Sequence, residues 1–383
     1  MADNKLIELR EKMDEIDDSI VDLLAKRMKV SENIAGYKRE NNLPILDRTR
    51  EREKLMELSK KAEPEMESYT RILYSLLFDM SKEHQLKLNQ KPGNVYELFT
   101  KALGGTQKEF PKRETVACQG IEGAYAQLAS DKFFDVPCIL YMKNFEGVFA
   151  AIDNGLCKYG VLPLENSTAG SVNKVYDLMM KYNFHIVRGA RIKIDHNLLV
   201  NTGVKKEEIT EIVSHEQAFL QCTEFLKKFK NVKVTVCENT AVAAKMVRES
   251  GRRDLAALSS YTCAELYELD IIESSVQNRG NNYTKFICIA KDLEIYPAAD
   301  KTSLMMVIPN KPGALYKVLS RFFVLGINLI KLESRPIPDR DFEYMFYFDV
   351  DGSVYSKEFN TLISEIDDLS EEVRYLGSYL ELI

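Results

Sequence analysis

Cysteine and histidine are scarce in this sequence, with seven cysteines and four histidines among 383 residues. No two cysteines form a Cys-x-x-Cys pair, and the histidines lack the spacing of metal ligands, which argues against a disulfide framework and against a zinc site. We therefore expect buried, reduced thiols and chemistry that needs neither a metal nor another cofactor. The residues concerned are Cys118, Cys138, Cys157, Cys222, Cys237, Cys263, Cys288, His84, His185, His196 and His215.

Long apolar runs and an excess of positive charge are also missing. No apolar run approaches the ~20 residues of a membrane span, and the first residues are charged, unlike a signal peptide. The net charge of −6 argues against nucleic acid as a partner. Apolar residues make up 45% and charged residues 29%, as in soluble globular proteins. We expect a cytoplasmic protein, and its length predicts two or three domains.

Residues 3 to about 88 have the periodicity of helices. Apolar side chains recur in alternating steps of three and four, which is a heptad seam. A helix over residues 5–39 would be about 50 Å long, more than a small domain covers. A third helix is predicted over residues 68–88, after a second helix that Asp47 can cap, so two chains are expected to wrap around each other. The seam consists of Leu6, Leu9, Met13, Ile16, Ile20, Leu23, Val30 and Ile34.

Arg27 occupies the same apolar seam, where an unpaired guanidinium costs several kcal/mol. Lys38 follows three turns later, about 16 Å along the same side, so the two side chains can close on one small dianion. Arg10 is about 25 Å from Arg27 and on another face, so a second, antiparallel copy would have to supply it. Surface charges or interhelical salt bridges are the alternative explanation.

Several short segments of this region occur in a specific order. They are Leu9-Arg10-Glu11-Lys12, Lys26-Arg27, Gly36-Tyr37-Lys38, Asp47-Arg48-Thr49-Arg50-Glu51-Arg52 and Ser81-Lys82-Glu83-His84-Gln85. This order resembles the all-helical type of chorismate mutase. The resemblance implies an intertwined dimer in which Lys38 and Gln85 donate hydrogen bonds to the breaking ether oxygen. It implies a chorismate site formed by Arg10, Arg27, Lys38, Asp47, Arg50, Glu51, Ser81 and Gln85.

Residues 91–112 lose this periodicity and are rich in glycine and proline, which predicts a linker. Short apolar strands then alternate with helical stretches over residues 113–292, which predicts an α/β domain with room for two lobes and a cleft. Strands are expected at 115–118, 159–162, 184–191, 212–214, 232–237, 256–258 and 285–290.

Polar loops follow several of these strands, where open α/β sheets place their ligands. Residues 164–171 combine Glu165, Asn166 and glycine ahead of a helix, so backbone N–H groups can meet a carboxylate, although an ordinary N-cap uses the same residues. The segment 214–217 contains His215, which alone is more often structural than catalytic. Gly120 and Gly123 suit a tight turn, and Thr284 at a strand start suits β propensity.

Together these loops resemble prephenate dehydratase, a family with a two-lobed fold like that of periplasmic binding proteins. The resemblance implies that the Thr284 hydroxyl assists departure of the ring hydroxyl and that Lys285 fixes a carboxylate. It also places Glu165, Asn166, Ser214 and Gln221 in the pocket. Five positions depart from the family motifs: Ile121, Ala124, Ala126, Glu216 and Lys285. Lysine in place of arginine keeps the charge but loses the bidentate fork.

The C-terminal residues 300–383 predict the order β-α-β-β-α-β, which is ferredoxin-like. The glycine turn at residues 310–316 and the strand end at 332–336 resemble the ACT domain of prephenate dehydratases. This resemblance implies an allosteric phenylalanine site and pairing of the domain with a second copy. A plain packing module is the alternative. The implied phenylalanine ligands are Gly313, Ala314, Leu315, Tyr316, Asn328, Leu329, Glu333, Ser334, Arg335 and Pro336.

The resemblances cover nearly the whole chain in the order of the bifunctional P-protein of phenylalanine biosynthesis. We expect a multidomain fold: an all-α mutase domain at 1–90, a two-lobed α/β dehydratase domain at 113–292, and an α+β ACT domain at 300–383. The expected partners are chorismate, prephenate and the inhibitor phenylalanine, in a homodimer or a dimer of dimers. Three alternatives remain open: loss of one activity, preference for arogenate, and a non-catalytic sensor of aromatic ligands.

Overall fold

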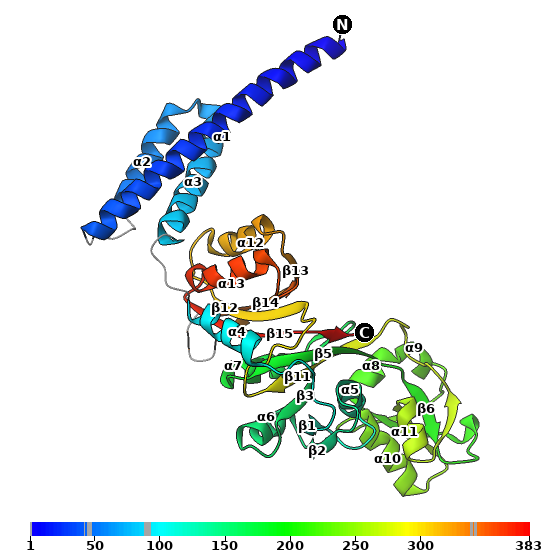
Figure 1. The fold of residues 1–383 in the computed structure, drawn as a ribbon. Helices are drawn as coiled ribbons and strands as arrows, with labels where there is room; N and C mark the ends of the chain where they lie inside the picture. The colour runs from blue at the N-terminus through cyan, green and yellow to red at the C-terminus, as the bar shows by residue number, and fades with distance from the viewer. Residues whose placement is uncertain (1, 42, 44–47, 88–92, 338–339, 341–342) are drawn as a thin grey trace. The chain divides into compact units, whose positions relative to one another are not determined.

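The computed structural model describes residues 2–41, 43, 48–87, 93–337, 340 and 343–383, and Figure 1 shows its fold. The chain divides into two compact units, residues 1–92 and residues 93–383. Among the described helices, none combines the length and the apolar composition needed to cross a membrane.

The first unit is formed by three helices. The long first helix and the third helix confirm the predicted ranges 5–39 and 68–88, whereas Asp47, the predicted cap of the second helix, lies outside the described residues. The third helix packs against both others. The elements are α1 (Ala2–Glu40), α2 (Arg48–Lys61), the short 3-10 helix η1 (Pro64–Met66) and α3 (Glu67–Lys87).

The apolar seam of α1 is largely uncovered within this chain. Ile16 and Ile20 are each 55% exposed and Leu23 is 64% exposed. Ile72 and Leu76 on α3 are exposed as well. A contiguous apolar surface of this kind marks an interaction site rather than an ordinary solvent face.

The second unit begins with a seven-stranded mixed sheet, in the order β16-β5-β11-β3-β1-β2 with β4 beside β3. Buried aliphatic and aromatic side chains from both faces of this sheet form two hydrophobic clusters, which explains its continuous apolar strands. The elements are β1 (Thr115–Gln119), α5 (Tyr125–Phe133), β2 (Cys138–Met142), α6 (Phe145–Asp153), β3 (Tyr159–Asn166), β4 (Gly170–Ser171), α7 (Asn173–Lys181), β5 (His185–Lys193), β11 (Tyr283–Ala290) and β16 (Glu381–Leu382).

A five-stranded sheet in the order β10-β6-β9-β7-β8 forms the second lobe. The chain leaves the first sheet after β5 and returns to it at β11, so two crossovers join the lobes. This confirms the two-lobed α/β prediction. The elements are β6 (Asn197–Val200), η2 (Lys206–Glu208), β7 (Glu211–Ser214), α8 (Glu216–Gln221), α9 (Thr223–Leu226), β8 (Lys233–Val236), α10 (Thr240–Ser250), β9 (Leu255–Ser259), α11 (Tyr261–Leu266) and β10 (Asp270–Glu273).

The C-terminal region is a four-stranded antiparallel sheet in the order β13-β14-β12-β15. Its chain order confirms the ferredoxin-like prediction. Figure 1 shows both helices on one face of this sheet. The elements are β12 (Lys301–Val307), α12 (Ala314–Val324), β13 (Asn328–Pro336), β14 (Tyr344–Asp351), α13 (Lys357–Leu369) and β15 (Glu372–Tyr379).

The predicted linker at 91–112 is wrong for most of its length, because residues 94–105 form helix α4 (Asn94–Gly105). Val95, Phe99 and Ala102 lie on one face of this helix and are buried in the core of the C-terminal domain. The Phe99 ring lies 5.7 Å from that of Phe359 and 6.0 Å from that of Tyr375. The segment is therefore a structural part of the C-terminal domain.

The C-terminal domain shares a hydrophobic core with the first lobe. Met305 and Tyr347 of its sheet belong to the same cluster as Leu164 and Tyr176, and the two tyrosine rings meet edge to face at 4.6 Å. The short strand β16 pairs in parallel with β5. The two domains therefore form one packed body.

The cysteines are all free, as expected. Five of the seven are buried, but Cys138 is exposed and Cys237 is half-buried, so the prediction of burial was wrong for these two. Cys138 opens the edge strand β2, which explains its access to solvent.

Candidate active sites

Six of the eight residues predicted to hold chorismate line one cavity of about 460 Å³ in the first unit. The cavity lies between side chains of α1, α2 and α3, and it contains five cationic groups and an apolar wall. Its size suits a small organic anion. The predicted residues that line it are Arg27, Lys38, Arg50, Glu51, Ser81 and Gln85.

Arg27 is fixed against α3 rather than exposed on the seam. Its Nη1 donates to the Leu77 carbonyl at 2.9 Å and to the hydroxyl of Ser81, and its guanidinium lies 5.7 Å from the Phe78 ring centroid. Burial lowers the pKa of Arg27, with Tyr74 acting in the opposite direction. These partners of Arg27 are neutral, so its charge is available to an anion that binds in the cavity.

Gln85 and Glu51 are also held in place around the cavity. The Gln85 amide Nε2 donates to Ser31 at 2.8 Å, and both residues are buried. The Glu51 carboxylate lies 3.2 Å from Lys82 Nζ. Burial alone would lower the pKa of Lys82, but Asp79 and Glu51 raise it above its usual range. These contacts fix two polar groups at the cavity wall before any ligand binds.

Two predicted chorismate ligands are not brought to the cavity within this chain. Arg10 is exposed on α1, about 25 Å along the helix from Arg27. Asp47 lies outside the described residues. The site in one chain therefore lacks the third arginine that the family resemblance implies.

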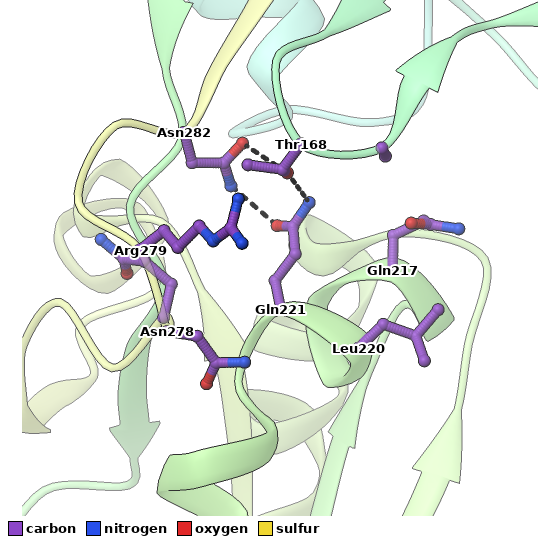
Figure 2. A pocket seen from close by; sticks show the side chains of 9 residues that line it. Thr168, Gln217, Leu220, Gln221, Asn278, Arg279 and Asn282 are labelled. Carbon is purple, nitrogen blue, oxygen red and sulfur yellow. Dashed lines mark hydrogen bonds between the residues drawn. The ribbon is translucent and has the colours of Figure 1, made fainter.

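The second unit has a cavity of about 410 Å³ between residues of the two lobes. Figure 2 shows amide and hydroxyl side chains on its wall, with the guanidinium of Arg279 extending toward Gln221 and Asn282. Of the predicted dehydratase residues, Gln221 lines this cavity. The full lining is Thr168, Ala169, Gln217, Leu220, Gln221, Gln277, Asn278, Arg279 and Asn282.

Asn166 links this wall to Thr284, which is buried behind it. Asn166 Nδ2 donates to Thr284 Oγ1 at 2.9 Å and to Asn282 Oδ1 at 2.8 Å. Its Oδ1 accepts from the hydroxyl of Thr168 at 2.7 Å and from the backbone N–H of Ala169 at 2.8 Å, so the orientation of the amide is fixed. Because Asn166 donates to the Thr284 oxygen, the hydroxyl hydrogen of Thr284 is available for another acceptor.

Gln221 joins the two lobes at the same place. Its Oε1 accepts from Asn282 Nδ2 at 2.8 Å and from His196 Nε2 at 3.0 Å, and its Nε2 donates to Thr168 at 3.2 Å. Burial lowers the pKa of His196, although the hydrogen bond to Gln221 opposes this. His196 is therefore neutral near pH 7 and donates through Nε2.

Lys285 and Glu165 do not face this cluster, which corrects the expectation that they line the substrate pocket. In the β3–β11 ladder Asn166 pairs with Thr284, and Glu165 pairs with Lys285. Successive strand residues point to opposite faces, so the second pair points away from the first. Lys285 Nζ lies 2.9 Å from Asp349 of the C-terminal domain, and Glu165 lies 3.0 Å from Lys331.

Ser214 and His215 are structural in this arrangement. Ser214 is fully buried and donates to the Leu258 carbonyl at 2.7 Å, so the expectation that it lines the pocket is wrong. His215 caps α8, with its Nδ1 accepting from the Gln217 N–H at 3.2 Å. The contacts of His215 thus favour a structural role over a catalytic one.

The predicted phenylalanine ligands separate into two groups. Ala314 and Leu315 line a cavity of about 360 Å³ in the C-terminal domain, together with Tyr344 and Phe346. Within the described residues, the lining does not include Gly313, Tyr316, Asn328, Leu329, Glu333, Ser334, Arg335 or Pro336.

Glu333 and Arg335 contact the dehydratase domain instead. The hydroxyl of Ser171 donates to Glu333, and Arg335 Nη2 lies 2.7 Å from Asp177. These contacts correct the expectation that both side chains face a bound amino acid. They follow from alternation along β13, whose half-buried residues all point to one face.

Sequence reasoning missed several cavity residues. Arg279 and Asn282 lie in the crossover between β10 and β11, and His196 lies in the crossover between β5 and β6. A crossover has no periodicity, so only the Asn-Asn pair ahead of Thr284 pointed to this place. Lys54 and Lys82 in the first unit were missed because charged residues on helices are usually solvated.

Comparison with known proteins gives matches to both units. The family model described as "Chorismate mutase type II" matches residues 9–86, and "Prephenate dehydratase" matches residues 116–294. The bifunctional chorismate mutase/prephenate dehydratase of Enterobacter agglomerans is 32% identical over 388 residues, covering 98% of this chain and 96% of that protein.

Two further relatives cover the second unit. Arogenate dehydratase 3 of Arabidopsis thaliana is 34% identical over 313 residues, covering 76% of this chain and 71% of that protein. The crystal structure of the Arthrobacter aurescens prephenate dehydratase in complex with L-Phe has a TM-score of 0.63 and 25% identity, covering 70% of this chain and 89% of that one. Because the first similarity extends over both units and nearly all of either protein, the chain belongs to the family of bifunctional chorismate mutase/prephenate dehydratases.

Proposed function

We propose that the first unit rearranges chorismate to prephenate and that the second unit converts prephenate to phenylpyruvate, under inhibition by phenylalanine. The main observation that supports this function is that Arg27, Lys38, Arg50 and Gln85 line one cavity. A cavity with this excess of positive charge suits a small dicarboxylate. The Asn166–Thr284 pair supports the second activity.

The rearrangement of chorismate needs no nucleophile and no acid. It is a concerted step in which a C–O bond breaks while a C–C bond forms, so the enzyme holds both ends close in a chair. In this proposal Arg27 and Arg50 bind the carboxylates, and Lys38 and Gln85 donate hydrogen bonds to the ether oxygen, where negative charge grows. The fixed Gln85 amide is ready for this role without rearrangement.

A second copy of the chain completes this site. The exposed seam of α1 provides an apolar surface for another α1, and an antiparallel copy would carry its Arg10 to the cavity of the first. A homodimer is thus the smallest assembly with a complete mutase site. The C-terminal domains pair in the same assembly, and the enzyme works in the cytoplasm.

The second reaction expels the ring hydroxyl and the ring carboxylate together. The electrons of the bond to the carboxylate enter the ring as the C–O bond breaks, and an aromatic ring, water and carbon dioxide result. The Thr284 hydroxyl donates to the departing oxygen and relays the proton that it takes up from solvent. Asn166 holds the Thr284 oxygen, which directs the hydroxyl hydrogen toward the substrate.

Arg279 takes the carboxylate-binding role that the motif suggested for Lys285. Its guanidinium extends into the cavity of the second unit, whereas Lys285 faces the C-terminal domain (Figure 2). Among the described residues no hydrogen-bond or ion-pair partner of Arg279 is found. A guanidinium also binds a carboxylate in a bidentate fork, which an ammonium cannot do.

Phenylalanine binds in the cavity lined by Ala314, Leu315, Tyr344 and Phe346, whose apolar wall suits an aromatic side chain. Arogenate carries an amino group in place of the keto oxygen of prephenate. The relative from Arabidopsis thaliana is called an arogenate dehydratase, so both compounds are included in the test.

The test is a paired assay of the full chain. Chorismate loss is followed by absorbance, and phenylpyruvate is measured separately from prephenate, with and without phenylalanine. Prephenate and arogenate are compared as starting materials for the second step. Loss of chorismate and enzymatic formation of phenylpyruvate are expected, with less phenylpyruvate when phenylalanine is added. A chain that binds these compounds but converts neither would be a sensor, and the proposal would fail.

A further inference from the structure

A row of ion pairs connects the dehydratase sheet to the C-terminal domain. Lys285 Nζ lies 2.9 Å from Asp349, 3.2 Å from the Tyr379 hydroxyl and 3.6 Å from Glu381. The Glu381 carboxylate lies 2.7 Å from Arg191. The Lys285, Asp349 and Glu381 side chains are at least 85% buried, so these charges interact strongly.

A second group of contacts continues the row along β3 and β4. Lys331 Nζ lies 3.0 Å from Glu165 and 2.8 Å from the Ser171 hydroxyl. Its side chain is 12% exposed. Glu165 and Lys285 are partners in the β3–β11 ladder, so the C-terminal domain contacts both strands at the same level.

The surrounding packing is tight enough to transmit a displacement. The Lys285 ammonium lies 5.5 Å from the centroid of the Tyr379 ring, and Tyr379 belongs to the hydrophobic core that both domains share. Gly377 has a positive φ, and a Cβ at this position would collide with the backbone of Ile186. Close-packed interiors move as bodies rather than deform smoothly.

The residues next to these ion pairs are those of the dehydratase cluster. Thr284 directly precedes Lys285, and Asn166 directly follows Glu165, with the two pairs on opposite faces of the ladder. A shift of the Lys285 side chain therefore moves the backbone that carries the Thr284 hydroxyl. A misplacement of about 1 Å is enough to reduce turnover by roughly 100-fold.

We propose that Lys285 and Glu165 are positioning residues, through which the C-terminal domain holds Thr284 and Asn166 in their reactive arrangement. This inference rests on the proposed dehydratase function, and it assigns the C-terminal domain a role in turnover even without phenylalanine. A ligand that displaces the domain would then slow the reaction through the same contacts.

The test replaces Lys285 by methionine in the full chain, which removes the charge and keeps the apolar stem. Dehydratase kcat should fall by about 10- to 100-fold while KM for prephenate changes by less than about threefold, because the substrate cavity is intact. Lys285→Arg keeps the charge and should restore most of the turnover. Lys301→Met is the matched control, since Lys301 pairs with Asp351 at 2.6 Å within the C-terminal domain.

Each outcome decides the question. Turnover by Lys285→Met within twofold of wild type overturns the inference, as does an equal loss in Lys301→Met, which would indicate general destabilisation. If Lys285→Met does not fold, Asp349→Glu is tested, because it keeps the ion pair but displaces the carboxylate by one methylene. Lower kcat in that variant supports the inference, and unchanged kcat overturns it. Wild-type chain without dehydratase activity would instead refute the proposed function.

Discussion

Arg10 and Arg27 lie on the same helix, but about 25 Å apart and on different faces. Arg27 lines the mutase cavity, whereas Arg10 is exposed. If each mutase site takes Arg10 from a second copy, an Arg10→Ala chain and a Lys38→Met chain should each be inactive. Refolded together in equal amounts, they should recover about one quarter of wild-type chorismate turnover, because half of the dimers are mixed and each mixed dimer has one complete site.

The control for this mixture is an Arg10→Ala,Lys38→Met double variant mixed with wild type. Here one site of each mixed dimer lacks Arg10 and the other lacks Lys38, so no activity beyond that of the wild-type homodimers is expected. A mixture of the two single variants that stays inactive would show that both residues serve one chain.

Gln85 is expected to make the mutase reaction insensitive to pH, because its amide donates without titrating. We expect wild-type mutase turnover to be roughly flat between pH 6 and 9. Gln85→Glu should lose activity by about tenfold per pH unit above the pKa of the new carboxyl, since only the protonated acid can donate. The measurement is chorismate loss across this range, and a steep alkaline loss in the wild type would contradict the role of Gln85.

Thr284 is expected to be essential for the second reaction alone. Thr284→Val keeps the size and removes the hydroxyl, so dehydratase kcat should fall by at least about 100-fold while mutase turnover stays unchanged. Thr210→Ala is the control, since Thr210 is a surface hydroxyl that bonds Asp254. Substantial phenylpyruvate formation by Thr284→Val would remove Thr284 from the mechanism.

Arg279 is expected to govern substrate binding in the second unit. Loss of one charge-assisted contact costs about 1.5–3 kcal/mol, so Arg279→Gln should raise KM for prephenate by about 10- to 100-fold. The KM of Arg279→Lys should lie between that of the wild type and that of Arg279→Gln, because lysine keeps the charge but cannot form the bidentate contact. Arg253→Gln, which alters an exposed arginine paired with Glu208, should leave KM unchanged.

Burial of His196 is expected to reduce the free energy of unfolding of the protein in acid. Its pKa is lowered by burial, so the unfolded chain takes up a proton below about pH 6.5 while the folded chain does not. Stability is therefore complete above that pH and falls as the pH drops toward the lower folded pKa, by at most about 1.4 kcal/mol per pH unit. Calorimetry at pH 7.5 and 5.5 should show a smaller loss in His196→Gln, in which an amide can replace the Nε2 donor.

A part of this acid sensitivity should remain in His196→Gln. Burial also lowers the pKa of His185 and of His215, and both are unchanged in that variant. An identical acid loss in wild type and His196→Gln would mean that His196 does not contribute.

The sequence predicted the helices and most strands because their periodicity comes from burial. The heptad seam predicted α1, and the short apolar runs predicted β3, β5 and β11. Helix α4 was missed although Val95, Phe99 and Ala102 follow a helical spacing, because the flanking prolines and glycines suggested a linker. Its partners, such as Phe359, are more than 200 residues away in the chain.

The candidate sites were predictable to a smaller extent. In the mutase unit helical spacing brought Arg27 and Lys38 together, the family resemblance supplied the other ligands, and six of the eight line one cavity. In the dehydratase unit the motif placed Thr284 and Lys285 together in the sequence, but strand alternation separates them in space. Which face of the β3–β11 ladder binds the substrate depends on where the second lobe and the C-terminal domain pack. The sequence of the two strands does not show this packing.

Strand β16 also bears on how the protein is made. Its partner β5 and the ladder partners β3 and β11 are all synthesised well before residues 381–382 leave the ribosome. Helix α4 is likewise made early, yet its aromatic neighbours around Phe99 are Phe359 and Tyr375, which are made much later. Until residues 381–382 have been made, the edge of β5 therefore lacks its partner strand, and an open strand edge is a place where a nascent chain can pair wrongly.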